Sequence, residues 1–272
     1  MEDTKGKSPL IGVFDSGVGG LSVWKELIKI VPDNPILYLS DSAYCPYGPR
    51  SQEEIIARAK VITEFLISKG VTLIVIACNT ATAAAIDTLR KSYKVPFIGM
   101  EPAVKPAALH SKSGVIGVLA TQGTFKGKLY HRTLEHFASD INVIEKIGTG
   151  LVELVESGET NSEKTKKILK RYIDPMIAGK ADHIVLGCTH YPFLLDAIKE
   201  IAGEEVVIVD PSPAVAQHTL DILAQNGSLS DEKIDSSLQT TFYSAGSIDN
   251  LARMAKSILP SIPDDHFKQI CI

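Results

Sequence analysis

The chain has 272 residues, of which 44% are hydrophobic, and its 28 basic and 32 acidic residues leave a net charge of −4. This balance excludes the clustered basic surface of a nucleic-acid-binding protein and the low hydrophobicity of a disordered chain. The first residues lack the apolar stretch of a secretory signal, and the longest apolar run, residues 71–77, is far shorter than the roughly 20 residues that span a bilayer. We therefore expect a cytoplasmic protein whose partners include neither nucleic acid nor membrane.

Short β-branched runs alternate with longer amphipathic stretches along the chain. We expect strands at residues 10–14, 36–39, 73–77, 96–99, 115–119, 142–147, 183–186, 206–209 and 240–243. Helical patterns fill the gaps, for example at residues 51–68, 81–92, 124–137, 162–178 and 214–225. Continuous apolar strands separated by helices indicate parallel sheets covered on both faces. The prediction is an α/β, doubly wound fold.

Segments of the first half recur in the second half. Residues 11–16 (IGVFDS) align with residues 116–121 (IGVLAT) at an offset of 105, and residues 73–80 align with residues 183–190 at an offset of 110. The order and the similar offsets indicate two pseudo-symmetric domains with a cleft between them, although unrelated apolar strands can also look alike. We expect the first domain at residues 1–99 with residues 210–272, and the second at residues 100–209.

The repeat places Cys78 and Cys188 at matched strand ends, where ligands bind in open α/β sheets. A helix that begins there would direct free N–H groups at the thiol and lower its pKa. Two thiols across a cleft could remove a proton from one face of a carbon and return a proton to the other face.

Other uses of the two cysteines fit less well. They could be inert buried residues, but that leaves the matched positions unexplained. A redox disulfide usually has CxxC spacing, which is absent. A zinc site would need further ligands, of which only His190 is at hand, and a Cys–His hydrolase needs one cysteine.

Asp15 ends the first predicted strand and aligns with Ala120 in the repeat, so it breaks the symmetry of the halves. The glycine-rich residues 16–20 that follow match neither G-x-G-x-x-G nor a P-loop. Asp15 could hold a substrate ammonium group or tune a thiol, or it could simply cap the following helix.

Four segments resemble glutamate racemases: residues 12–21 (GVFDSGVGGL), 46–48 (PYG), 77–81 (ACNTA) and 186–192 (LGCTHYP). The resemblance extends from about residue 10 to residue 224. It implies two pseudo-symmetric α/β domains and conversion of L-glutamate to D-glutamate for peptidoglycan synthesis, cell-wall biogenesis and cell shape. It also implies no cofactor and no metal, and we expect a homodimer.

The resemblance assigns roles by motif. Cys78 and Cys188 would be the acid/base thiols, supported by Asp15 and His190 respectively. The helper glutamate would fall on Glu156. Glu153 competes for this role, because this chain has a glutamate at position 153 where many relatives have a proline. Substrate contacts are implied for Asp15, Ser16, Tyr47, Gly48, Asn79, Thr80, Thr121, Thr189 and His190. We expect Cys45 and Cys271 to have no role.

Two alternatives stay open on the sequence. One is a related two-cysteine racemase that acts on aspartate or another acidic amino acid. The other is a non-catalytic amino-acid-binding protein on the same scaffold, which would have no need of paired cysteines.

Overall fold

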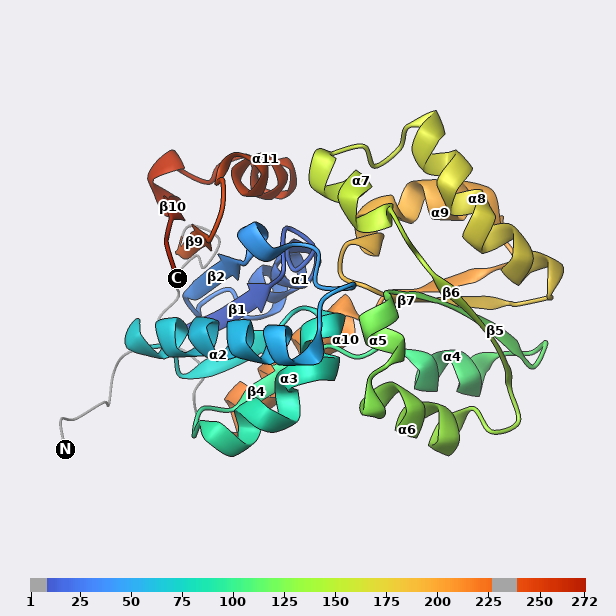
Figure 1. Ribbon diagram of the computed structural model, residues 1–272, viewed down its shortest axis with the longest axis horizontal. Coiled ribbons are helices and arrows are strands. Elements are labelled where there is room, and N and C mark those ends of the chain that lie inside the picture. Colours follow the sequence, from blue (N-terminus) through green and yellow to red (C-terminus); the bar gives the residue numbers. More distant parts are fainter. Residues whose placement is uncertain (1–8, 227–238) are drawn as a thin grey trace.

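The computed structural model describes residues 9–226 and 239–272, and its strands form two parallel sheets (Figure 1). The larger sheet lies on the left of Figure 1 and has the order β10-β9-β2-β1-β3-β4. Its strands are β1 (Ile11–Asp15), β2 (Ile36–Ser40), β3 (Leu73–Ile76), β4 (Phe97–Gly99), β9 (Thr240–Ser244) and β10 (Phe267–Gln269).

The smaller sheet, on the right, has the order β6-β5-β7-β8. Its strands are β5 (Val115–Ala120), β6 (Asn142–Ile147), β7 (His183–Gly187) and β8 (Val207–Val209). This order repeats β2-β1-β3-β4 of the larger sheet. The register repeats as well, since Ile11 lies opposite Leu73 and Ile116 lies opposite His183, as the two sequence offsets require. The duplication seen in the sequence is therefore present in the arrangement of the strands.

Helices cover both faces of the sheets. They are α1 (Leu21–Ile30), α2 (Gln52–Ser68), α3 (Asn79–Ser92), α4 (Val104–His110), α5 (Gln122–Phe125), α6 (Lys128–Phe137), α7 (Leu151–Ser157), α8 (Glu163–Ala178), α9 (Leu195–Ala202), α10 (Ser212–Gln225) and α11 (Asp249–Ile258), with short 3₁₀ turns η1 (Ser42–Tyr44), η2 (Tyr191–Leu194) and η4 (Asp264–His266). The fold-class prediction of α/β with mainly parallel sheets is confirmed.

The strands β1, β2 and β3 of the larger sheet are buried on both sides because alternate residues pack into different cores. In β3, Val75 belongs to the core that contains Trp24 of α1. Its neighbours Ile74 and Ile76 belong to the opposite core, with Ile62 of α2. This arrangement explains why the strand reads as a continuous apolar run rather than as an alternating one.

The predicted helix over residues 124–137 is wrong in one respect, because the chain forms two helices there. α5 ends at Phe125 and α6 begins at Lys128. Between them Gly127 is extended, and a Cβ at this position would lie 2.7 Å from the Cβ of Ala83 in α3. The close approach to α3 thus explains the break, which the local helical pattern did not reveal.

The chain after β8 returns to the larger sheet. Ser212 at the start of α10 hydrogen-bonds Ser22 of α1 through their Oγ atoms, 3.2 Å apart, and β9 pairs in parallel with β2. Strands up to residue 99 and from residue 240 thus share one sheet, and strands between residues 115 and 209 form the other. The domain boundaries near residues 100 and 210 stay a prediction. Within residues 9–226 and 239–272, no helix is both long and apolar enough to span a membrane.

Candidate active site

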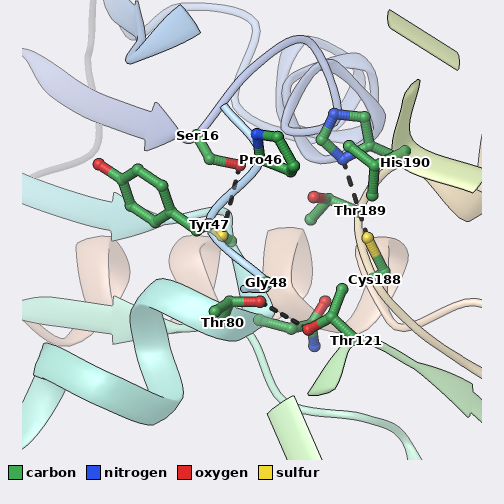
Figure 2. A pocket seen from close by; sticks show the side chains of 12 residues that line it. Ser16, Pro46, Tyr47, Gly48, Thr80, Thr121, Cys188, Thr189 and His190 are labelled. Carbon is green, nitrogen blue, oxygen red and sulfur yellow. Dashed lines mark hydrogen bonds between the residues drawn. The ribbon is translucent and has the colours of Figure 1, made fainter. Parts of the chain in front are cut away.

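Loops that leave the carboxyl ends of β1, β3, β5 and β7 converge on one pocket (Figure 2). Both predicted thiols line it, together with every predicted substrate-contact residue except Asp15. The lining residues are Ser16, Pro46, Tyr47, Gly48, Cys78, Asn79, Thr80, Thr121, Val152, Cys188, Thr189 and His190. They come from both halves of the chain, so a ligand bound here would touch both.

Cys78 occupies the N-cap position of α3, and its sulfur accepts a hydrogen bond from the N–H of Ala81 at 3.4 Å. The thiol in turn donates to Ser16 Oγ at 3.9 Å. The expectation that the helix N-terminus lowers the thiol pKa is wrong for Cys78. Burial, reinforced by the negative charge of Asp15, raises the pKa of Cys78 and outweighs the Ala81 N–H. At neutral pH this residue is therefore a protonated thiol.

Cys188 lies beside an imidazole, with its sulfur 3.8 Å from His190 Nδ1. On the other side of the ring, His190 Nε2 lies 2.8 Å from Glu156 Oε1. Burial alone would lower the pKa of His190, but hydrogen bonds with Cys188, Cys45 and Glu156 raise it well above its ordinary value. Cys188, His190 and Glu156 thus form a relay, in which the imidazolium ion of His190 lies between the Cys188 sulfur and the Glu156 carboxylate.

Glu156 of α7 has a lowered pKa, because hydrogen bonds, that of His190 first, outweigh the opposing effect of burial. Its Oε1 atom also accepts from the backbone N–H of Val18 at 2.8 Å. A Cβ on Gly17 would collide with this carboxylate, which explains the glycine there. Of the two glutamates considered from the sequence, Glu156 is the one that contacts His190, whereas Glu153 is exposed and lines a different pocket.

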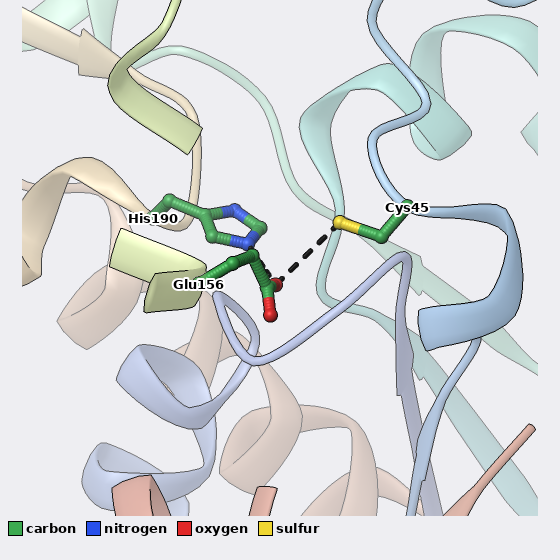
Figure 3. Close-up of side chains that lie close together, drawn as sticks. All are labelled: Cys45, Glu156 and His190. Carbon is green, nitrogen blue, oxygen red and sulfur yellow. Dashed lines mark hydrogen bonds and ion pairs between the residues drawn. The ribbon is translucent and has the colours of Figure 1, made fainter. Parts of the chain in front are cut away.

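Sequence reasoning missed two further contacts of Glu156. Asn250 of α11 donates from Nδ2 to Oε2 at 2.7 Å, and the Cys45 thiol donates to Oε1 at 3.5 Å (Figure 3). Cys45 was expected to have no role, but it directly precedes the Pro46-Tyr47-Gly48 segment, and that adjacency was an available signal. Nothing in the local sequence pointed to Asn250.

Asp15 is fully buried behind the pocket. Its Oδ1 accepts from the N–H of Gly17 at 2.8 Å, and its Oδ2 accepts from the hydroxyl of Thr189 at 3.0 Å. Burial raises its pKa, against the opposing charge of His190. Asp15 does not cap α1, whose N-cap is Gly20. It instead joins the end of β1 to the loop after β7.

The remaining predicted substrate contacts differ in what they offer to the pocket. Thr80 and Thr121, one from each half, share a hydrogen bond with Oγ1 atoms 2.7 Å apart (Figure 2). The Tyr47 hydroxyl donates to Asp41, so its polar end is already engaged. Asn79 Oδ1 is buried and finds no hydrogen-bond partner among the described residues, so it is available to accept from a bound molecule.

Comparisons with known proteins agree with this geometry. Residues 11–219 match the family model Asp/Glu/Hydantoin racemase. The chain is 46% identical over 233 residues to a glutamate racemase of Herpetosiphon aurantiacus, covering 86% of this chain and 92% of that protein.

Two solved structures are similar in fold. A Francisella tularensis glutamate racemase in complex with D-glutamate has a TM-score of 0.83 and 28% identity, with 97% of each chain covered. An Escherichia coli glutamate racemase in complex with L-glutamate and the activator UDP-MurNAc-Ala has a TM-score of 0.82 and 30% identity, with 97% of this chain and 99% of that chain covered.

Proposed function

Because the chain belongs to the Asp/Glu/hydantoin racemase family and is an isomerase, we propose that it interconverts L- and D-glutamate by a cofactor-independent, two-thiol mechanism. The observation that carries the proposal is the pair Cys78 and Cys188, which follow equivalent strands of a duplicated fold and line one pocket. The names of the relatives, and the glutamate bound in two similar structures, support the choice of substrate.

Each turnover transfers two protons at one carbon. In the L-to-D direction the Cys188 thiolate takes the α-proton, and the C–H electron pair moves into the Cα–carboxylate system. The Cys78 thiol then donates its proton to the opposite face, the electron pair forms the new C–H bond, and Cys78 is left as the thiolate. The reverse direction exchanges the two roles.

The polar groups around the pocket would stabilise the intermediate carbanion. Asn79, Thr80 and Thr189 follow the strands that carry the thiols, and their N–H and hydroxyl groups can face the charge that develops on the α-carboxylate. General acid–base transfer contributes about 10²–10⁴-fold to rate, so this preorganised electrostatic stabilisation has to supply much of the rest. Closure of the two halves around the substrate would strengthen it by excluding water.

The neighbours of the thiols set their starting protonation. The imidazole of His190 lies beside Cys188, and Glu156 holds it in place. Burial, reinforced by the negative charge of Asp15, raises the pKa of Cys78 and keeps it protonated. Cys78 would thus be ready to donate a proton in the L-to-D direction.

We also propose that the D-glutamate supplies peptidoglycan synthesis and that the enzyme works as a homodimer in the cytoplasm. These finer points rest on the resemblance of the sequence to glutamate racemases.

The test is circular dichroism of L-glutamate incubated with the purified, EDTA-treated protein without added cofactor. We expect the signal to decay to zero, and L-aspartate, assayed in parallel, to keep its signal. Decay with aspartate alone would assign the other acidic amino acid. No decay with either, together with binding of glutamate in calorimetry, would indicate the non-catalytic alternative. Activity lost on EDTA treatment and restored by zinc would contradict the cofactor-independent mechanism.

A further inference from the structure

One thiol next to the active site has no part in the proposed mechanism. Cys45 lies in the loop after η1, and its Sγ, Glu156 Oε1 and His190 Nε2 all lie within 4.8 Å of one another (Figure 3). The three residues come from three separate segments and are half-buried or buried. Thiolate, imidazole and carboxylate are the three ligand types that zinc takes in proteins.

We propose that Cys45, Glu156 and His190 form a binding site for Zn²⁺ or a similar soft divalent cation, and that the bound cation inhibits the enzyme. This site shares His190 with the substrate pocket but does not include Cys78 or Cys188, which lie across that pocket. The inhibition rests on the proposed function, whereas binding of the cation does not.

The distances suit a tetrahedral ion after a small adjustment. Zinc bonds of about 2.0–2.3 Å place tetrahedral ligand atoms roughly 3.3–3.6 Å apart. Cys45 Sγ and Glu156 Oε1 are 3.5 Å apart already. His190 Nε2 and Glu156 Oε1, now 2.8 Å apart, would separate by about half an ångström once the ion replaces the hydrogen bond between them. The fourth position would take water, as in open zinc sites.

Neighbouring groups already orient two of the ligands, as the partners of metal ligands usually do. Asn250 Nδ2 donates to Glu156 Oε2, the oxygen that would not bind the ion. His190 Nδ1 faces Cys188, so Nε2 is the ring nitrogen directed at the proposed site.

The charges of the ligands would balance that of the ion. The ion would bind the Cys45 thiolate, the Glu156 carboxylate and the neutral His190 imidazole, and the protons that these groups carried would leave to solvent. Two negative ligands thus offset one divalent cation, and no net charge is left in a largely buried site.

Two consequences of binding would stop racemisation. His190 would leave the relay, because its Nε2 would bind the ion in place of its hydrogen bond with Glu156 Oε1. In addition, Cys45 directly precedes Pro46, Tyr47 and Gly48, which line the substrate pocket. An ion that ties Cys45 to α7 and to the loop after β7 would hold this wall of the pocket in place against substrate entry and release.

Cobalt(II) makes binding visible, because a cobalt–thiolate bond absorbs in the near ultraviolet. We expect this absorption on titration of the wild-type protein with Co²⁺. It should persist in Cys78→Ser, Cys188→Ser and Cys271→Ser, and disappear in Cys45→Ser, with Cys45→Ala as a second variant should the first fail to fold. Absence of the band in the wild-type protein, its retention in the Cys45 variants, or its loss in Cys78→Ser or Cys188→Ser would overturn the proposal.

Inhibition is measured as the Zn²⁺ concentration that halves racemisation, relative to the zinc-free rate of the same variant. Loss of a partner that only orients a ligand costs roughly 10–100-fold in metal affinity, so loss of the Cys45 ligand should raise that concentration by at least about tenfold. Equal inhibition of the wild-type protein and Cys45→Ser would assign zinc to the substrate pocket and overturn the proposal. If the protein proves not to be a racemase, the cobalt titration alone decides.

Discussion

The two pocket thiols occupy equivalent places in a duplicated fold but meet different neighbours. Cys78 follows β3 and contacts neutral groups, the Ala81 N–H and the Ser16 hydroxyl, with the charge of Asp15 nearby. Cys188 follows β7 and lies beside the imidazolium of His190, which Glu156 holds from the far side. The repeated strand order places both thiols, but it does not give them the same electrostatic environment.

The difference begins in the residues that follow each cysteine. After Cys78 the chain enters α3 at once, so the sulfur itself caps the helix. After Cys188 the chain first forms η2, which contains Pro192, and α9 begins only at Leu195. His190 is therefore the N-cap residue of η2 and not part of an α-helix, and its ring lies beside the sulfur. A duplicated backbone can therefore hold two unlike acid/base groups, as proton transfer across a stereocentre needs.

The largest expected effect tests whether both thiols are needed. Cys78→Ser and Cys188→Ser should each abolish net racemisation, because serine is a far weaker acid and base near neutral pH and general acid–base transfer is worth about 10²–10⁴-fold. Circular dichroism of either enantiomer measures the rate, and far-ultraviolet spectra of the variants verify the fold. A variant with near-wild-type turnover in both directions would show that the thiol replaced in it is not needed for racemisation.

The second prediction separates the two glutamates of α7. Glu156→Gln should lower kcat by about tenfold or more, equivalent to roughly 1.4 kcal/mol, because His190 loses the carboxylate that holds its positive charge beside Cys188. Glu153→Gln is the matched control, since Glu153 lies one turn earlier, is exposed and has no contact with His190. Equal losses in the two variants would argue against the relay.

Much of the fold could be predicted because the strands are strongly apolar and bounded by turns. The nine expected strands were found with bounds within one residue, and most named helices within two. Among residues 9–226 and 239–272, the strand that was not expected is β10 (Phe267–Gln269), which is short and largely exposed and so lacks a hydrophobic pattern. The break at Gly127 depends on contact with Ala83, a tertiary fact that no local pattern encodes.

The candidate site was predictable where residues lie in motifs, and less so elsewhere. Cys78, Cys188 and His190 stand at repeated strand ends, which the alignment of the halves exposes. Asn250 reaches Glu156 from a helix 94 positions away. The direction of the Cys78 pKa was mispredicted because a helix N-terminus is visible in the sequence, whereas complete burial is not.

A third prediction tests the division of labour through isotope effects. The equilibrium constant between enantiomers is one, so any variant loses the same factor of kcat/KM in both directions, and only separate steps can differ. We expect Asp15→Asn to increase the α-deuterium isotope effect more from D-glutamate, for which Cys78 is the proposed base. His190→Asn should increase it more from L-glutamate. Identical changes in the two variants would show that Asp15 and His190 do not act on different thiols.

A fourth prediction concerns the pKa of Cys78 itself. Since burial and Asp15 raise that pKa, Cys78 should contribute thiolate absorption only at alkaline pH. The measurement is an ultraviolet pH titration of the wild-type protein minus that of Cys78→Ser. In an Asp15→Asn background the same difference should appear at lower pH, because a negative charge that opposes ionisation is gone. A difference present at neutral pH in the wild-type protein would contradict the asymmetry of the thiols.

The smallest expected effect lies at Asn250, which supports the Cys188 side from outside the pocket. Asn250→Ala removes the hydrogen bond to Glu156 Oε2 and the exposed one that Asn250 Oδ1 accepts from Arg253. The Glu156 side chain is 21% exposed, so water can replace the lost donor. We expect the free energy of unfolding to fall by about 0.5–1.5 kcal/mol, the range for the part-buried hydrogen bond, because water readily replaces the exposed one. Because Asn250 does not line the pocket, kcat should fall modestly while KM stays unchanged.

Asn250→Asp should lower kcat further, because a second carboxylate beside Glu156 Oε2 would repel Glu156 and displace it from His190. Lys256→Ala on the same helix, where the lysine pairs with exposed Asp264, is the control and should leave kcat unchanged. A rise in KM without a change in kcat for Asn250→Ala would mean that α11 acts on substrate binding rather than on the relay beside Cys188.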